Sequence, residues 1–484
     1  MKELQKFPHS GIQTTLPKDI LFIVLIGISH FMTQAALGQA LAPLDNIGEE
    51  FASTNPGELS WFVAAYSLTV GTFIMISGRL GDIMGHKRIF TVGWLWFGCW
   101  SAFAGFSAYP RKQVFFDICR AMQGIGPALL MPNGMALLAR AYPPGLKKNI
   151  AFAVFGGLAP MGFVIGALSG SVFAQYAWWP WAFWSFALAC FGLGVLSTII
   201  IPKALSVRPT NPPTFDATGS VVGVTGLILV NVAWNNGPLF GWDTPHVYFL
   251  LLIGLLFLVA FVWVEQRATD PIVPFHALNS TVGYVLALVG FGWAAFGIWV
   301  FYVFRFAISL RGESPLTISA QYIPAIFSGL MCTAATGFLL THAPVTLPML
   351  LSMLVFCVGI VVAAMMPVRQ TYWAQLFVSI LIMPFGMDMS FPAASVIVSN
   401  HLPPEHQGLA GSLINTVVNY SISIALGIAG TVEVSIARND PARLEKGIRS
   451  AFYIAIALSL MGVVLSAIFM VRTFLREGWK ITAH

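Results

Sequence analysis

Long apolar runs recur along almost the whole of this 484-residue chain, and they constrain its fold more than any other feature. Only 9% of the residues are charged and 57% are hydrophobic, whereas ordinary soluble proteins carry about 25% charged residues. A helix needs about 20 apolar residues to cross a bilayer. The pattern therefore predicts an all-α polytopic membrane protein with about 14 transmembrane helices.

The apolar runs also predict where each crossing lies. We place the spans near residues 20–44, 58–78, 88–108, 113–139, 149–175, 181–201, 215–235, 245–265, 280–304, 317–341, 346–366, 371–397, 405–433 and 450–473. An even number of spans puts both termini on one face. Lys and Arg are more frequent in the segments on that face, above all in the first half, so we expect both termini to be cytosolic.

The segments between the spans exclude several classes of protein. The longest polar segments, near residues 202–215, 266–281 and 435–450, are far shorter than a small soluble domain. We therefore expect no catalytic or nucleotide-binding domain and no cofactor. The chain also lacks the G-x-x-x-x-G-K-[ST] phosphate loop, so any work against a gradient must draw on an ion gradient rather than on ATP.

Cysteines and net charge add two further limits. The five cysteines lie inside apolar runs without C-x-x-C spacing, which predicts packing residues rather than disulfides or a metal site. The net charge of +6 is explained by membrane topology. The positive net charge therefore does not indicate a nucleic-acid partner.

A repeat divides the chain into two halves. Met131-Pro132 is followed eleven residues later by Pro143-Pro144, and Phe391-Pro392 is followed eleven residues later by Pro403-Pro404, an offset of 260 residues in both cases. The offset lays spans 4 and 5 on spans 12 and 13 in the same orientation. Two halves related by an axis along the membrane normal would produce this pattern.

The repeat predicts two six-helix bundles, with spans 7 and 8 as an inserted two-helix hairpin that has no counterpart. Asp216 is expected to cap the first helix of that hairpin. The predicted divisions are a cytosolic tail over 1–19, a first bundle over 20–202, the inserted helices with their linkers over 203–279, a second bundle over 280–473 and a cytosolic tail over 474–484.

The fifth span contains a glycine-rich stretch from Gly156 to Gly170, GGLAPMGFVIGALSG. Small residues let two helix backbones approach closely, and a proline removes one backbone hydrogen bond, so we expect tight packing and a bend at Pro160. The stretch resembles the span-5 antiporter motif of drug/proton antiporters of the major facilitator superfamily, and plain tight packing is the alternative. The residues that carry this resemblance are Gly157, Pro160, Gly162, Gly166 and Gly170.

The predicted loop between spans 2 and 3 reads GRLGDIMGHKR from Gly78 to Arg88. It resembles the loop signature of the same superfamily, with Ile83 and His86 as departures from the usual basic residues. The resemblance implies a conformational clamp, and the alternative is a positively charged loop that only sets topology. The residues concerned are Gly78, Arg79, Asp82, Gly85, Lys87 and Arg88.

Arg120 stands deep inside the fourth span, where a buried charge needs polar partners. Counting about 1.5 Å per residue places it near the depth of Leu37 in the first span, so Gln34 and Gln39 are its expected partners. The segment from Arg120 to Gly126 resembles the superfamily's span-4 arginine signature, which is associated with proton coupling. In many drug-antiporter relatives an acid stands where Gln34 aligns.

Three other polar residues lie within predicted spans. Asp388 in span 12 is an acid well inside the membrane, where ionisation is costly, so it is a candidate to carry the proton. A structural acid beside Pro392 is the alternative. His30 in span 1 is a second candidate, more often a packing histidine, and Glu433 is expected at the outer interface.

Beyond these motifs the resemblance covers nearly the whole chain. It includes residues 215–219, 231–238 and 408–421, and it points to the fourteen-span drug/proton antiporter branch, most of all the fungal aminotriazole-resistance type. What this implies is alternating access, with proton-coupled export of a small organic toxicant, drug or metabolite. The alternative is a facilitator or proton-coupled carrier of ammonium, borate or an amino acid. A monomer in the plasma membrane, or in the vacuolar membrane, is expected.

Overall fold

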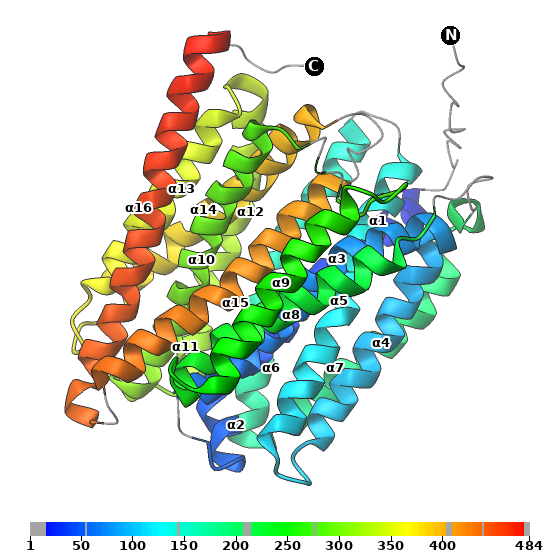
Figure 1. The fold of residues 1–484 in the computed structure, drawn as a ribbon. Helices are drawn as coiled ribbons and strands as arrows, with labels where there is room; N and C mark the ends of the chain where they lie inside the picture. Colours follow the sequence, from blue (N-terminus) through cyan, green and yellow to red (C-terminus); the bar gives the residue numbers. More distant parts are fainter. Residues whose placement is uncertain are drawn as a thin grey trace, which may run out of the picture.

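The computed structural model is a bundle of long helices (Figure 1). It describes residues 16–53, 56–142, 146–206, 214–273, 275, 278–402, 409–437 and 440–478. Within these ranges 14 helices are long and apolar enough to cross a membrane, which confirms the predicted number of spans. The first begins and the last ends on the same side of the bundle (Figure 1).

The first half of the chain supplies six of these long helices and one short helix between the first two. They are α1 (Leu16–Leu41), α2 (Leu44–Glu50), α3 (Pro56–Met84), α4 (His86–Phe106), α5 (Gln113–Ala141), α6 (Leu146–Tyr176) and α7 (Pro180–Ile200).

The remaining helices form the hairpin and the second half. They are α8 (Ala217–Phe240), α9 (Pro245–Glu265), α10 (Ser280–Ser309), α11 (Pro315–Gln321), α12 (Ile323–His342), α13 (Thr346–Ala364), α14 (Gln375–His401), α15 (Leu409–Ala437) and α16 (Leu444–Glu477). The predicted tenth span is two helices, because the chain turns at Tyr322 between α11 and α12.

The two halves repeat one packing scheme. In the first half α1 packs along α6, both α3 and α4 pack on α5, and α4 packs on α7. In the second half α10 packs along α15, both α12 and α13 pack on α14, and α13 packs on α16. This correspondence is the one that the 260-residue offset predicts. Met131-Pro132 and Phe391-Pro392 lie in α5 and α14, whereas Pro143-Pro144 and Pro403-Pro404 lie outside the described residues.

The halves meet along two corresponding interfaces. The second long helix of each half packs against the fifth long helix of the other, so α3 lies along α15 and α6 contacts α12 together with the short α11. Hydrogen bonds cross both interfaces: Ser423 Oγ donates to the Ala64 carbonyl at 3.1 Å, and the hydroxyls of Ser171 and Ser319 lie 2.9 Å apart.

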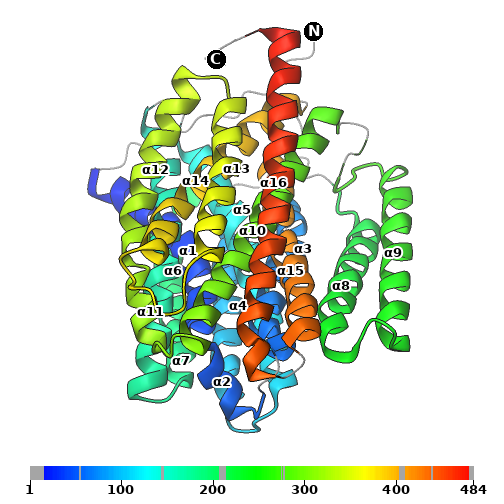
Figure 2. The same cartoon turned by 90° about the vertical axis from the view of Figure 1, so that its left-hand side faces the viewer.

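Helices α8 and α9 form the inserted hairpin on the side of the two bundles (Figure 2). Helix α8 packs on α3 and α15, while α9 packs on α8 and exposes most of its apolar surface. The expected cap is present, since the Asp216 carboxylate accepts a hydrogen bond from the Gly219 amide at 2.8 Å. The fold class is confirmed, and the residue boundaries of the divisions remain predictions. Most of the predicted tails, 1–15 and 479–484, lie outside the described residues.

Candidate transport site

Arg120 on α5 lies at the centre of a buried cluster in which each of its three guanidinium nitrogens donates a hydrogen bond. Its side chain is 0% exposed. Nε donates to the Phe62 carbonyl on α3 at 2.9 Å, Nη2 donates to the Ala36 carbonyl on α1 at 3.0 Å, and Nη1 donates to Gln123 Oε1. The Tyr66 ring lies 4.7 Å from the guanidinium carbon. Charge-assisted hydrogen bonds to three helices offset the cost of burying this cation.

The partners expected for Arg120 were wrong, although the expected depth was right. The contact with Ala36, next to Leu37, agrees with the predicted level in α1. The amides of Gln34 and Gln39 are not among the partners of Arg120. Gln39 is 1% exposed and its Nε2 has no hydrogen-bond partner among the described residues, while Gln34 is half-buried. Backbone carbonyls, which any sequence supplies, took the role assigned to the amides.

Asp117 was not among the site residues predicted from the sequence. It stands one helical turn before Arg120 on α5, with Gln113 and Glu58 close to its carboxyl group. Its Oδ1 is buried and has no hydrogen-bond partner within the described part of the chain. The i, i+3 spacing from Arg120, which puts both side chains on one face of a helix, was the available signal.

Asp388 on α14 lies where the second bundle meets α6 of the first. The Thr336 hydroxyl on α12 donates to the backbone carbonyl of Asp388 at 3.2 Å, not to its carboxyl group. A Cβ added at Gly329 on α12 would lie 2.8 Å from Cγ of Pro160 and 3.3 Å from Asp388 Oδ2. That oxygen is buried and has no hydrogen-bond partner among the described residues. One oxygen of the half-buried Asp388 carboxyl group therefore lacks the donor that a buried carboxylate oxygen requires.

His30 joins α1 to α6. Its Nδ1 lies 3.0 Å from the Phe155 carbonyl, and its ring stacks on the Phe155 ring with 4.9 Å between centroids. These contacts are those of a packing histidine, the alternative weighed from the sequence.

The antiporter-motif residues of α6 divide between two faces. Three glycines face α1, where an added Cβ would overlap backbone atoms in every case, so the two helices approach as closely as backbones allow. These glycines are Gly162, Gly166 and Gly170, which face Phe31, Ala35 and Gln39 respectively. The predicted tight packing is present, and it lies within the first bundle.

The other two motif residues face the second bundle. A Cβ at Gly157 would lie 3.6 Å from Leu330 and 3.8 Å from Thr333 on α12, and Pro160 packs against Gly329. Helix α6 runs without a break through Pro160, and the bend expected there remains a prediction. Helix α6 thus packs its backbone against α1 on one face and packs against α12 beside Asp388 on the other.

The segment from Gly78 to Arg88 is a helix junction, not the loop predicted. Helix α3 continues to Met84, and α4 begins at His86, so Gly85 alone connects them. Its φ of +97° explains why glycine stands there, since this backbone conformation is strained for residues with a Cβ.

A polar network fastens this junction to α5. His86 lies 2.8 Å from Asn133 Oδ1 through Nδ1 and 3.3 Å from Asp82 through Nε2. Arg140, near the end of α5, approaches the same Asp82 oxygen at 3.5 Å. A Cβ at Gly81 would overlap Asn133. His86, a departure from the family pattern, is therefore built into the network.

The remaining charges of the junction point elsewhere. Lys87 donates to the carbonyls of Thr198 and Ile201 at the end of α7, at 2.9 and 2.5 Å. Arg79 lies 3.7 Å from the carboxylate of Asp270, in the segment after α9. Hydrogen bonds from Thr214 hold the pKa of Asp270 below its usual value. The hairpin linker thus contacts the junction.

Arg88 and Gly78, the last and first residues of the segment, do not take part in the network around Asp82. Arg88 is exposed. Gly78 faces α15, where an added Cβ would lie 3.5 Å from Ser412 Oγ. The junction therefore touches the second bundle at the end of the α3/α15 interface.

The sequence predicts Glu433 at the outer interface, and the structure places it near the end of α15 with a buried side chain. It is 0% exposed, accepts a hydrogen bond from Tyr302 at 2.9 Å and forms an ion pair with Arg305 at 2.8 Å. This pair joins α15 to α10 inside the second bundle. Arg305 and Glu433 lie 128 positions apart in the chain, and no pattern in the sequence predicts their contact.

The sequence model of the Major Facilitator Superfamily matches residues 21–427 and 337–481. This chain belongs to the major facilitator superfamily (MFS). The membership confirms the family predicted from the motifs, and MFS proteins of this kind are multi-pass membrane transporters.

Curated relatives agree over nearly the full length. The chain is 50% identical to the low affinity ammonium transporter of Saccharomyces cerevisiae, covering 99% of this chain and 95% of that one. It is 42% identical to the efflux pump terJ of Aspergillus terreus, covering 95% and 89%. It is 38% identical to the aminotriazole resistance protein of S. cerevisiae, covering 95% and 85%. The predicted resemblance to the fungal aminotriazole-resistance type is confirmed.

Among solved structures, the crystal structure of a POT family transporter in complex with a thioalcohol-conjugated peptide has the same fold. The TM-score is 0.68 at 13% identity, covering 95% of this chain and 96% of that one. At this identity the likeness concerns the fold alone, and it is the fold of an MFS transporter.

Proposed function

We propose that this MFS transporter exports a small organic compound in exchange for protons, by alternating access between its two bundles. The observation that carries the proposal is the Asp388 carboxyl group, which lies between α14, α12 and Pro160 of α6 with a buried oxygen that lacks a donor. An acid in this position couples its protonation to the contact between the bundles.

The coupling follows from the cost of burying a charge. A carboxylate without donors is unfavourable while α6 covers it, and a neutral carboxylic acid is tolerated. Protonation of Asp388 therefore favours the closed α6/α12 contact, and opening this contact to water favours release of the proton. This coupling is reciprocal. A proton bound to Asp388 shifts the balance between the two conformations, and the change of conformation alters the proton affinity of Asp388 by the same factor.

The first bundle moves as one body in this proposal. Hydrogen bonds from Arg120 tie α5 to α1 and α3, and the glycines of α6 hold it against α1. The junction around Gly85 tethers α3, α4 and α5 at the termini side through Asp82 and Arg140. Motion is then confined to the α3/α15 and α6/α12 interfaces, where the two bundles meet.

The substrate proposed is an organic toxicant, drug or metabolite, supported by the names of two relatives, an efflux pump and an aminotriazole resistance protein. The 50% identity to an ammonium transporter favours a second candidate, a carrier of a small polar solute such as ammonium. Gln34, where many drug-antiporter relatives carry an acid, keeps a facilitator without proton coupling as the alternative mechanism. We propose a monomer in the plasma membrane, with the vacuolar membrane as the alternative. We also propose that both termini are cytosolic, which the distribution of Lys and Arg supports.

The test is proton flux into sealed vesicles that carry the purified protein, with solutes added one at a time. The panel contains aminotriazole and other aromatic toxicants, borate, ammonium and amino acids. Wild type is compared with Asp388→Asn, and with Asp243→Asn as a matched change at an exposed acid.

The proposal predicts that one solute drives proton movement in wild type and Asp243→Asn but not in Asp388→Asn. An aromatic toxicant as that solute supports export of organic compounds, and ammonium supports the second candidate. Solute movement without proton movement in wild type overturns the coupling and indicates a facilitator.

A further inference from the structure

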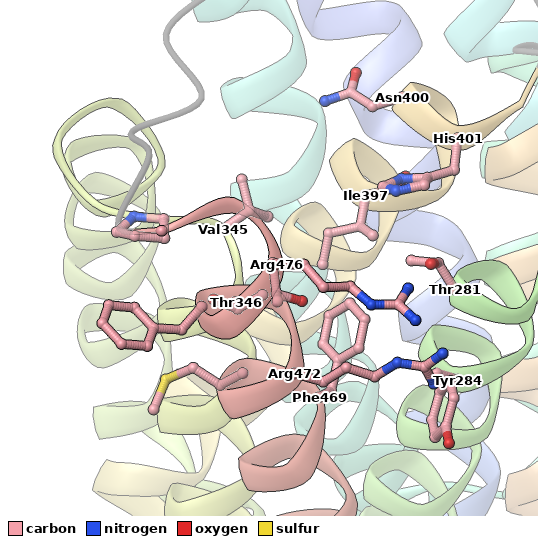
Figure 3. A pocket seen from close by; sticks show the side chains of 15 residues that line it. Thr281, Tyr284, Val345, Thr346, Ile397, Asn400, His401, Phe469, Arg472 and Arg476 are labelled. Atoms are coloured by element: carbon pink, nitrogen blue, oxygen red, sulfur yellow. The ribbon is translucent and has the colours of Figure 1, made fainter.

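A cavity of about 110 Å³ with both polar and apolar lining residues opens in the second bundle, on the side where α16 ends (Figure 3). Four helices form it: the start of α10, the start of α13, the end of α14 and the end of α16. It lies away from Asp388 and from both interfaces between the bundles, so transport as proposed does not use it. Its polar lining residues include Thr281, Tyr284, Asn400, His401, Arg472 and Arg476.

Two arginines make this cavity strongly basic. Arg472 and Arg476 stand one turn apart on α16, and their guanidinium groups extend side by side toward Thr281 and Tyr284 on α10 (Figure 3). The guanidinium carbon of Arg472 lies 5.5 Å from the Tyr284 ring centre. No acidic residue lines the cavity in the part of the chain that the structure describes. Adjacent arginines without a carboxylate present the donor geometry that a phosphate group accepts.

An exposed apolar surface continues from the same two arginines along the outer face of α16. It is lined by Arg472 and Arg476 together with Ala467, Ile468, Val471 and Leu475. Val471 is 52% exposed and Leu475 is 77% exposed, as expected of side chains that face lipid. A basic cavity beside an exposed apolar helix face fits a molecule with an anionic head and a hydrocarbon chain.

The corresponding place in the first bundle is built differently. A cavity there is lined by the start of α1 and the ends of α5 and α7, the counterparts of α10, α14 and α16. Its acid Asp19 forms an ion pair with Lys147, and Lys147 also lies over the Tyr142 ring. The lining of the first-bundle cavity therefore combines the cation Lys18 with the acid Asp19, whereas the lining of the second-bundle cavity, among the described residues, holds two arginines and no acid.

We propose that the cavity around Arg472 and Arg476 binds the phosphate group of an anionic phospholipid, whose acyl chain lies along the adjoining apolar face of α16. With the termini cytosolic, this side faces the leaflet in which anionic lipids are concentrated. The lipid would fasten α16 to α10 and α14 at the membrane surface.

The experiment measures lipid retention by the full-length protein. Protein reconstituted in vesicles of phosphatidylcholine with phosphatidylinositol is extracted in mild detergent, and bound lipid is counted by native mass spectrometry. The variants are Arg472→Gln with Arg476→Gln, the charge-retaining Arg472→Lys with Arg476→Lys, and Arg369→Gln at an exposed arginine elsewhere. Thermal unfolding in phosphatidylcholine alone verifies that each variant is folded.

Wild type and Arg369→Gln are expected to retain phosphatidylinositol about tenfold or more above the double glutamine variant, because each Arg near an anionic surface contributes substantially to binding. The double lysine variant is expected to recover part of the difference. Equal retention by the double glutamine variant overturns the proposal. The proposal is also overturned if inorganic phosphate protects lipid-free protein from thermal unfolding as strongly as phosphatidylinositol does. The ligand would then be a soluble anion.

Discussion

Arg120 and Asp388 are both ionisable residues inside the membrane, and the structure treats them in opposite ways. Arg120 donates to carbonyls on two other helices and to Gln123. Asp388 has a buried oxygen with no donor among the described residues. A satisfied charge holds helices in one arrangement, whereas an unsatisfied one makes the arrangement depend on its protonation. The comparison predicts a structural role for Arg120, which the resemblance associated with proton coupling, and a coupling role for Asp388.

The largest effect is expected when Arg120 is removed. Arg120→Ala leaves two carbonyls and Gln123 without their donor and opens a cavity among α1, α3 and α5. We expect a loss of about 3 kcal/mol or more in the free energy of unfolding, seen as low yield of monodisperse protein and a reduced Tm. Arg369→Ala is the control, and equal stability of the two variants would contradict a structural role for Arg120.

Glu433 extends the comparison to a second carboxyl group. Glu433→Gln leaves Arg305 buried without its counter-charge, so we expect a loss of about 3 kcal/mol in stability. Thermal unfolding in detergent measures it. A Tm equal to that of wild type would show that the pair with Arg305 contributes little.

Gly329→Ala tests the contact beside Asp388. The added Cβ would lie 2.8 Å from Cγ of Pro160, so the closed α6/α12 interface must move apart. We expect a stability loss of about 1 kcal/mol and a larger loss in transport rate. Gly337→Ala on the same helix meets nothing within 4 Å and serves as the control. Transport by Gly329→Ala at the wild-type rate would mean that this interface does not close during the cycle.

Asp388→Asn should leave stability within about 1 kcal/mol of wild type, in contrast to Glu433→Gln, because no ion pair is lost. Proton-coupled transport should nevertheless be abolished. Parallel unfolding curves of the two amide variants provide the measurement. A loss of stability as large as that of Glu433→Gln would identify Asp388 as a structural acid.

The smallest effect is expected at the contact of Arg79 with Asp270. This pair is partly exposed, so Asp270→Asn should cost no more than about 1 kcal/mol. The Thr214 bonds lower the pKa of Asp270 from its usual 3.8, so its contribution is present above pH 3.8 and is lost as the pH falls through the lower folded value. Unfolding at pH 7 and pH 5 should therefore show the same difference between variant and wild type. A difference that disappears at pH 5 would contradict this assignment.

The fold could be predicted from the sequence because, in a membrane, each helix is specified by its own stretch of residues. Each span must bury its backbone hydrogen bonds within a helix about 20 residues long, so apolar runs alone predicted the 14 spans. The depth of Arg120 followed from the constant rise of the helix. The sequence showed Gly85 between the second and third spans. The predicted spans on each side of it were too short, because α3 continues to Met84 and α4 begins at His86.

The chain's own residues thus determined the spans, the two-fold repeat, the family and the close packing of the α6 glycines, since each depends on residue type and on regular helix geometry. Only the tertiary structure decided which groups meet. It paired Glu433 with Arg305, replaced the glutamines at Arg120 with backbone carbonyls, and left Asp388 beside Pro160 without a donor. These outcomes depend on the rotation and approach of helices far apart in the chain, which the pattern within any one helix does not specify.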